Sequence, residues 1–345
     1  RWIIGLEFQS GFYTIDSTGN NKGVPDNNLV RDKVRSIQQF LFTQGELQLT
    51  RQISFQAGIS INDFRFRFQR TIGQPETDRI PASFKAQVVP RIAFLYRFTE
   101  NMALHASTSK GFSPPSLAEI RPSAGGFSLG LQAEHGWNHE IGVKGSAFSR
   151  RIQFDLAMFR FNLKDAIVRR TNAAGSEYFI NAGGTKQNGI ELFAEGYPVR
   201  RPGHSALSQI RLWSSVTLSD FTFSDYTVNL TSYSGNKLTG VPRKVILAGL
   251  DIEFLRNFYI QTTFNHADKI PLTDANDEFA DAYRLWQSRI GWRKMLRSVR
   301  LEVFFAVDNI GNEKYSLGND LNAFGRRFYN PAPERNYSGG IMLKF

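Results

Sequence analysis

The stretch VRLEVFFAVD, residues 299–308, places an apolar side chain at every second position, and its charged residues fall only between them. Because successive side chains of a strand point to opposite faces, this pattern predicts a strand with one apolar and one polar face. The stretches 84–98 and 243–254 repeat it. Such runs exceed the roughly 5–6 residues that are usual in soluble proteins and fit the roughly 9–11 residues of a tilted strand that crosses a bilayer.

The two faces of these strands predict two environments. We expect the apolar face to contact lipid and the polar face to line the interior of a closed sheet. The residues expected on the lipid side are Phe84, Val88, Ile92, Phe94, Ile246, Leu250, Val299, Val303 and Phe305. Those expected on the interior side are Lys85, Arg91, Asp251, Arg300 and Glu302.

The whole chain follows this plan, with connections that alternate in length. About fourteen strands are predicted, near 1–14, 37–50, 52–68, 84–98, 101–111, 136–148, 151–169, 177–198, 205–220, 241–254, 257–267, 282–294, 299–310 and 336–345. Long connections fall near 15–36, 69–83, 112–135, 170–176, 221–240, 268–281 and 311–335, and short ones at 50–52, 99–100, 149–150, 199–204, 255–256 and 295–298. Barrels of the outer membrane sort their loops by side in this way. We therefore predict an all-β fold, a transmembrane antiparallel β-barrel that occupies residues 1–345.

Composition excludes several other classes. The 345 residues contain no cysteine, so disulfide scaffolds and thiolate metal sites are excluded. An aromatic content of 13% argues against disorder. The net charge of +11 raises the question of nucleic-acid binding, but the basic residues form no single patch, and we expect no nucleic-acid partner. No Gly-x-Ser-x-Gly or Walker motif is present, so we expect no catalytic residue, no cofactor and no bound metal. The acidic run 274–278 is expected to be a solvated loop.

The C-terminal residues carry a separate signal. Tyr337, Ile341, Leu343 and the terminal Phe345 alternate with more polar or smaller residues. A terminal phenylalanine on an alternating strand is similar to the assembly signal that outer-membrane barrels present to their insertion machinery. We therefore expect the barrel-assembly machinery to be a partner of this segment.

Five stretches together resemble the barrel domain of TonB-dependent outer-membrane receptors. They are KGFSPPSLAE (110–119), LQAE with NHEIGVK (131–144), AGGTKQNGIEL (182–192), VDNIGNEKY (307–315) and the close from Pro333 to Phe345. Ala133 and Glu334 stand where the family usually has Pro and Gly. Each motif is weak alone, but their order and spacing agree with the family over about residues 110–345.

The resemblance implies a barrel of about 22 strands with a plugged lumen. This chain would supply roughly the last fourteen strands, with the plug domain, the TonB box and about eight strands lying outside it. We accordingly expect a fragment of a longer protein. The resemblance further implies a receptor of the bacterial outer membrane, surrounded by lipid and lipopolysaccharide. It would take up a ferric siderophore or a similar iron complex, energised by TonB through the plug.

Arginine and aromatic residues near the long loops are the candidate ligand site. Guanidinium groups offer fixed planar donors and stack on rings, which suits an anionic, partly aromatic chelate. The candidates are Arg65, Arg67, Arg121, Arg169, Arg170, Arg326, Arg327, Phe112 and Tyr329. The alternative for these arginines is contact with anionic lipopolysaccharide, which requires them to lie outside the barrel.

Other functions stay open from the sequence alone. Within transport, the ligand could instead be vitamin B12, haem or an oligosaccharide. A different class is a secreted β-rich carbohydrate-binding module, although the strand length, the loop sorting and the terminal phenylalanine argue against it.

Overall fold

The computed structural model describes residues 1–73, 77–122, 126–172, 175–181, 183–201, 206–228, 230–255 and 257–345. These residues are almost entirely β-structure, with a four-residue helix α1 (Leu117–Ile120) and a short 3-10 helix η1 (Phe324–Arg326). Neither helix of the described residues has the length and apolar character needed to cross a membrane.

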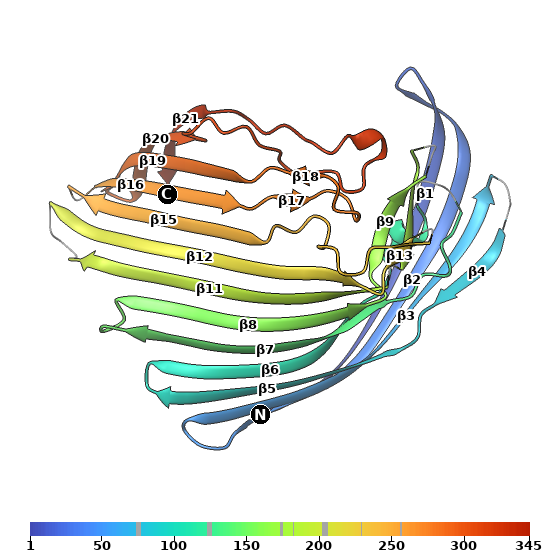
Figure 1. Ribbon diagram of the computed structural model, residues 1–345, viewed down its shortest axis with the longest axis horizontal. Helices are drawn as coiled ribbons and strands as arrows, with labels where there is room; N and C mark the ends of the chain where they lie inside the picture. The colour runs from blue at the N-terminus through green and yellow to red at the C-terminus, as the bar shows by residue number, and fades with distance from the viewer. Residues whose placement is uncertain are drawn as a thin grey trace.

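A single antiparallel sheet runs through the chain in sequence order (Figure 1). Its strands are β1 (Trp2–Asn21), β2 (Val24–Gln48), β3 (Ile53–Ile72), β5 (Gln87–Thr99), β6 (Met102–Ser113), β7 (Glu134–Ala147), β8 (Ile152–Lys164), β11 (Gly184–Arg200), β12 (Leu207–Ser224), β15 (Lys244–Phe254), β16 (Phe258–Ala267), β19 (Tyr283–Leu296), β20 (Val299–Asp308) and β21 (Asn336–Lys344). The short strand β4 (Thr77–Ser83) pairs with the far part of β3. The prediction of about fourteen long antiparallel strands is confirmed.

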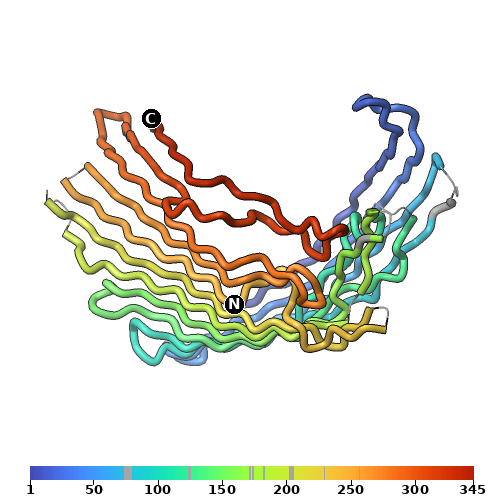
Figure 2. Tube along the Cα trace, turned by 45° about the horizontal axis from the view of Figure 1, so that its top comes forward, coloured from blue at the N-terminus to red at the C-terminus, as the bar shows by residue number. Residues whose placement is uncertain are grey.

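The sheet curves into an open trough (Figure 2). Its two edges are β1 and β21, and no pairing among the described residues joins one to the other. An open edge exposed to lipid would leave a row of backbone N–H and C=O groups unsatisfied. In a membrane each of these edges therefore requires a partner strand.

The two ends of the trough differ. Short connections lie at one end, the turn end on the left of Figure 1, and long connections lie at the other, the loop end. The turns at 199–204 and 255–256 include residues 202–204 and 256, which lie outside the described part. The long connections carry small hairpins of their own, made by β9 (Ile167–Thr171) with β10 (Glu177–Asn181), β13 (Thr227–Val228) with β14 (Thr231–Ser232), and β17 (Ile270–Pro271) with β18 (Phe279–Ala280). The predicted sorting of long and short connections is confirmed except between β1 and β2, where the loop-end connection is short.

The structure differs from the predicted bounds of one loop and two strands. The expected loop at 15–36 is instead a continuation of β1 and β2, which meet at a tight turn where Lys22 and Gly23 have φ of 48° and 91°. The expected strands 151–169 and 177–198 are each broken, between β8 and β9 and between β10 and β11. Asp165, with φ of 55°, donates its N–H to the Gly183 carbonyl at 2.7 Å. A Cβ at Gly183 would lie 2.1 Å from the Asp225 carbonyl oxygen, so this break requires glycine.

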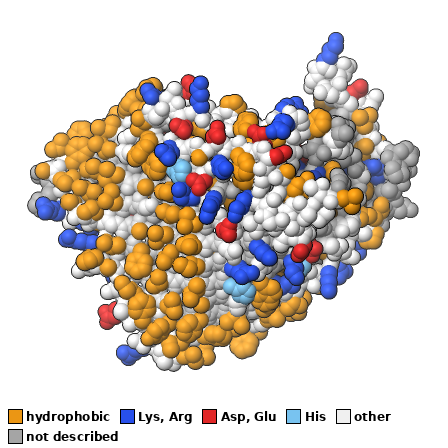
Figure 3. Space-filling model, in the orientation of Figure 1, with side chains coloured by type: hydrophobic (Ala, Val, Ile, Leu, Met, Phe, Trp, Pro, Cys, Tyr) orange, Lys and Arg blue, Asp and Glu red, His pale blue; other side chains and the backbone are white. Residues whose placement is uncertain are grey.

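The strand register separates two faces. Leu156, Leu192, Val216 and Ile246 are directly opposite one another on β8, β11, β12 and β15, and they belong to the apolar face. One residue away, Thr217 belongs to the polar face. Figure 3 shows charged side chains gathered toward the middle of the face in view and hydrophobic side chains over its left and lower parts. The alternation read from the sequence therefore does form two continuous surfaces.

Charged residues on the polar face pair with one another across strands. Arg211 lies between Glu195 and Asp251, at 2.9 Å from each carboxylate. Glu302 accepts hydrogen bonds from the Tyr259 hydroxyl at 2.5 Å and from Arg289 at 3.2 Å. Asp251 and Glu302 thus lie on the predicted polar face. These pairs satisfy charges that would be costly on the other side of the sheet.

The prediction for Phe84 was wrong. This side chain is 9% exposed and packs against Phe64 and Phe66 at the loop end, rather than facing lipid. The reason is that β5 begins only at Gln87, so residues 84–86 leave the sheet and Phe84 turns into a small core. By contrast, Val303 and Phe305 lie on the apolar face with 41% and 49% exposure.

Val216 and Thr217 provide a matched test of the two faces. In the full-length protein, we expect Val216→Lys to destabilise the assembled barrel by about 2–4 kcal/mol, because it places a charge in lipid near midplane. Thr217→Lys should cost much less, because Glu191 is directly opposite on the polar face. Urea unfolding in lipid vesicles measures both. Equal destabilisation by the two substitutions would contradict the assignment of the faces.

The C-terminal strand generates a second prediction. Tyr337, Ile341 and Leu343 lie on one face of β21, and Phe345 is 91% exposed beyond its end. We expect Phe345→Asp to reduce the assembled fraction of the full-length protein, measured by heat-modifiable gel mobility and surface labelling. Phe324→Asp, which alters an exposed phenylalanine at the loop end, is the control. Normal assembly of the Phe345 variant would show that the terminal residue is not an assembly signal.

Candidate ligand site at the loop end

The buried hydrophobic residues concentrate at the loop end rather than along the strands. One cluster joins Val34, Phe66 and Phe68 of β2 and β3 to Ile120 of α1. A second is built on Phe223 and Tyr226, and a third on Leu272, Ala280 and Phe328. These clusters give the long connections a core of their own and so fix the shape of the loop-end surface.

Asp274 holds four segments of the loop end together. Its carboxylate is buried and accepts hydrogen bonds from the Tyr226 hydroxyl at 2.7 Å, the Thr239 hydroxyl at 2.6 Å and the Asn322 amide at 3.1 Å. Arg170 of β9 forms an ion pair with it at 2.8 Å. Sequence reasoning predicted a solvated acidic loop here, and that prediction was wrong. The Asp-rich run gave no signal of the partners, which come from distant parts of the chain.

A groove of about 240 Å³ opens beside the connection that carries Asp274. It is lined by Ile270, Ala280, Asp281, Tyr283, Lys314, Tyr315, Ser316, Asn319, Tyr329 and Pro331. The rings of Tyr283 and Tyr315 lie 5.1 Å apart. An aromatic wall with a cation at its rim can stack on a planar ligand and attract negative charge. Of the predicted site residues, only Tyr329 lines this groove.

The exposed Arg326 and Arg327 precede Tyr329 in the chain and form a basic rim next to the groove that Tyr329 lines. The Tyr329 hydroxyl donates a hydrogen bond to Glu278 at 2.9 Å, and Arg326 pairs with the same carboxylate. The bond to Glu278 raises the pKa of Tyr329 above its ordinary value, with a smaller contribution from desolvation. Tyr329 therefore stays a neutral hydrogen-bonding group throughout the physiological range. Arg327 is exposed and has no ion-pair partner among the described residues.

Arg121 is a structural residue in this arrangement. It donates to Asp32 at 2.7 Å and to the Ser17 hydroxyl at 3.3 Å. Asp32 is fully buried and also accepts from Arg70 at 2.8 Å. The helix α1, capped by Ser116, positions Arg121 for this contact. A guanidinium that satisfies a buried carboxylate is not free to bind a ligand without a large cost.

Arg169 and Arg170, which are neighbours on β9, have different partners. Arg169 is exposed and pairs with Glu177 at 2.9 Å across the hairpin. Arg170 is half-buried. Its guanidinium lies 5.3 Å from the centre of the Tyr226 ring and forms the ion pair with the Asp274 carboxylate. The hairpin therefore exposes Arg169 to solvent, and Arg170 attaches the hairpin to Asp274.

Arg65 and Arg67 lie on a different side of the sheet from the groove. They alternate on β3 with Phe66 and Phe68, which are buried in the loop-end core, and they share the face of Ile61. The structure therefore does not bring all the candidate arginines together beside the groove. Phe112, partly buried at the end of β6, also lies apart from the groove, in register with His135.

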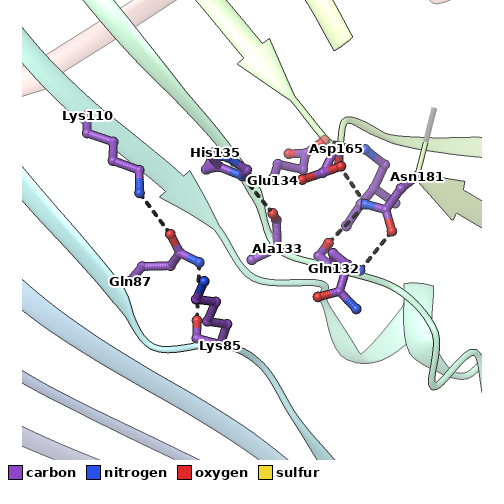
Figure 4. Close-up of polar contacts among 10 residues, drawn as sticks. Lys85, Gln87, Lys110, Gln132, Ala133, Glu134, His135, Asp165 and Asn181 are labelled. Carbon is purple, nitrogen blue, oxygen red and sulfur yellow. Dashed lines mark hydrogen bonds and ion pairs between the residues drawn. The ribbon is translucent and has the colours of Figure 1, made fainter. Parts of the chain in front are cut away.

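Polar contacts attach the β9–β10 hairpin to the end of β7 (Figure 4). Asn181 accepts a hydrogen bond from the Gln132 N–H at 2.7 Å and donates to the carbonyls of Gln132 at 3.0 Å and Asp165 at 2.6 Å. His135 lies 3.5 Å from the Asp165 carboxylate. The conformation after Leu131 is thereby locked to the strand break at Asp165. No cluster of three or more metal-ligating side chains occurs among the residues that the structure describes.

Comparisons with known proteins agree on one family. A family model described as TonB dependent receptor-like, β-barrel matches residues 1–310. The siderophore receptor PiuA from Acinetobacter baumannii matches with 16% identity and a TM-score of 0.70, over 99% of this chain and 52% of its own. The unliganded ferric citrate transporter FecA matches with 14% identity and a TM-score of 0.78, over 99% and 51%. The ferric yersiniabactin uptake receptor FyuA from Yersinia pestis matches with 17% identity and a TM-score of 0.72, over 100% and 51%. The chain thus spans about half the length of these structures, whose likeness establishes the fold.

Asp274 provides the test of the loop-end architecture. We expect Asp274→Ala in the full-length protein to destabilise the loop end by about 3–5 kcal/mol, because it leaves the half-buried Arg170 guanidinium unpaired. Limited proteolysis and hydrogen exchange of residues 221–240 and 311–335 should both increase. Asp281→Ala removes an exposed carboxylate from the same connection and is the control. Equal protection in both variants would contradict the role of Asp274.

Proposed function

Because the chain belongs to the TonB dependent receptor-like β-barrel family, we propose that it forms the barrel wall of an outer-membrane receptor that takes up a ferric siderophore or another iron complex. The observation that carries the proposal is the pairing of this fold with a tyrosine-lined groove at the loop end, next to the exposed Arg326 and Arg327. The family consists of receptors and transporters rather than enzymes. Energy would come from TonB through a plug domain that is not part of these 345 residues.

The iron-complex substrate class is supported by the solved structures that share the fold. They are a siderophore receptor, a ferric citrate transporter and a ferric yersiniabactin uptake receptor. Their identity to this chain is at most 17%, so the cargo is transferred here only as a proposal. The apolar face of the sheet would contact outer-membrane lipid, and the C-terminal strand would be read by the barrel-assembly machinery.

Within the loop end, we assign ligand contact to the groove and its rim. Tyr283, Tyr315 and Tyr329 offer ring faces and hydroxyls, and Arg326 and Arg327 offer exposed positive charge. Arg169 is exposed on the neighbouring hairpin and can contribute to capture. Arg121 and Arg170 act behind this surface by holding its loops in place. The division follows from which guanidinium groups are already committed to buried carboxylates.

Uptake by cells tests the function as a whole. The full-length protein is expressed in a Gram-negative strain that lacks its own ferric-siderophore receptors, and entry of radioactive iron is measured with a panel of siderophores. We expect uptake of at least one complex that requires both this protein and a functional TonB. Uptake of none of the complexes, with vitamin B12, haem and oligosaccharides tested in parallel, would redirect the substrate class.

The basic rim yields a specific prediction. Arg326→Ala with Arg327→Ala should lower the affinity for an anionic ferric complex by about tenfold at low salt, because two of the charges that attract it are lost. The loss should shrink at physiological salt, since exposed charges are screened over roughly 8 Å. The control is Arg150→Ala with Arg151→Ala, which removes the same charge from the turn end. Identical losses in both double variants would show that only net charge matters.

A further inference from the structure

His266, near the loop-end terminus of β16, contacts two oxygen atoms at once. Its side chain is 7% exposed. The Nδ1 atom lies 3.0 Å from the carbonyl oxygen of Tyr283 on β19, and the Nε2 atom lies 3.0 Å from the carboxylate of Asp268. The imidazole therefore bridges the connection that follows β16 to the beginning of β19.

The two contacts of this imidazole have a chemical requirement. A carbonyl oxygen and a carboxylate only accept hydrogen bonds, so each of them needs an N–H from the ring. A neutral imidazole has one N–H, and its other nitrogen is itself an acceptor. Only the cationic ring, with a proton on both nitrogens, satisfies the two contacts together. In the neutral ring one buried acceptor would face another, which is costly.

The charged groups around His266 come from three elements. Asp268, in the connection after β16, is the nearest, and its carboxylate also lies 3.8 Å from the Lys244 ammonium of β15. Arg284 of β19 is directly opposite His266, but its side chain is exposed, so solvent screens its charge. The Lys269 ammonium lies 4.6 Å from the centre of an aromatic ring. The carboxylate in hydrogen-bond contact is therefore the main electrostatic partner of the imidazole.

Tyr283, whose backbone His266 contacts, forms part of the wall of the tyrosine-lined groove. Its ring lies 5.1 Å from the ring of Tyr315, and both residues line the groove. Ala267 is directly opposite Tyr283 in the register. Because side chains alternate along a strand, the imidazole of His266 and the phenol of Tyr283 lie on opposite faces of the sheet. His266 thus contacts this wall from behind rather than from inside the groove.

The two ends of the bridge are held differently. The N–H of Asp268 donates to the Lys244 carbonyl at 2.9 Å, which fixes the backbone of Asp268 beside β15. Tyr283 is the first residue of β19 and follows two exposed residues, 281 and 282, that belong to no strand. The beginning of β19 is therefore the end of the bridge that can move when a contact of the imidazole is lost.

We propose that His266 is a positioning residue of the ligand groove, and that its cationic ring holds Tyr283 against Tyr315. When the ring releases one proton to solvent, one of its nitrogens faces an oxygen without a hydrogen between them, and the bridge opens at that contact. The groove wall is thus fixed at acid pH and loosened at alkaline pH. The assignment of a ligand to this groove rests on the proposed function, whereas the proton-dependent bridge does not.

Hydrogen exchange of the full-length protein without ligand tests the bridge. It is measured at about pH 5 and about pH 8, which bracket the range in which histidine ordinarily changes charge. Protection factors of the amides in 283–286 and 313–316 should be about tenfold higher at the lower pH, the effect expected of one hydrogen bond to a charged group. His266→Gln should give low protection at both pH values, because its single amide group cannot bridge the two acceptors.

Asp268→Asn distinguishes a proton-dependent bridge from simple packing. The new amide can donate to the Nε2 atom of a neutral ring whose Nδ1–H still donates to Tyr283, so protection should be high at both pH values. The matched control is His139→Gln, which alters an exposed histidine of β7 whose contact is with Thr108, and it should keep the pH dependence of the unaltered protein. Equal protection of the unaltered protein at the two pH values would overturn the proposal. So would a pH dependence that survives in His266→Gln.

Ligand binding separates this inference from the proposed function. The probe is the ferric siderophore that gives the greatest uptake in the cellular panel. The ratio of its affinity at about pH 5 to that at about pH 8 should be about tenfold larger for the unaltered protein than for Asp268→Asn, and this comparison cancels any pH dependence of the complex itself. Equal ratios would overturn the assignment of His266 to the ligand groove. If no siderophore is taken up, the proposed function fails, and hydrogen exchange still decides whether the bridge exists.

Discussion

The long sheet of this chain depends on the need of backbone N–H and C=O groups to find partners in a medium without water. Antiparallel pairing between sequence neighbours meets that need along each strand, and it fixes which side chains share a face. The ionic ladder around Arg211 and the apolar row around Val216 are two results of one register. A shift by one residue would exchange them, placing Arg211 in lipid and Val216 among charges.

Beyond the membrane the constraint changes, because loops need a core rather than a uniform outer surface. The chain meets this by burying Phe68, Ile120, Tyr226 and Leu272 between its long connections. Buried carboxylates such as Asp32 and Asp274 then join segments that are far apart in sequence, at the cost of using arginines that would otherwise be free. The number of arginines near the loops is therefore a poor measure of the positive charge that a ligand meets.

The strands were predictable because alternation follows directly from the pleat, and residues 299–308 become β20 almost to the residue. The breaks at Asp165 and Gly183 were not, since they depend on the hydrogen bond between these two residues and on the close approach of the Asp225 carbonyl, just beyond β12. In the same way, nothing local to Arg121 or Asp274 indicates their partners: Asp32 is 89 residues from Arg121, and Tyr226 is 48 residues from Asp274. In the sequence, the apolar residues of β3 change from odd positions, up to Ile61, to even positions, from Phe64 onward. A β-bulge and a change of the buried face would both give this pattern. Only the pairing of β2 with β3 decides between them.

That change of phase divides one pair of strands between two tasks. Up to Ile61 the apolar residues of β3 face lipid, and from Phe64 onward they face the loop-end core. Beyond Ile61, the outer face of β3 does not pack against other parts of the protein, so it can carry exposed charged side chains. On the neighbouring strand β2, Lys33 and Arg35 are exposed on the same face. The inner side of these strands then supports the loop-end core, while the outer side carries the exposed Lys33, Arg35 and Arg67. Both properties follow from where the hydrophobic residues stop facing lipid.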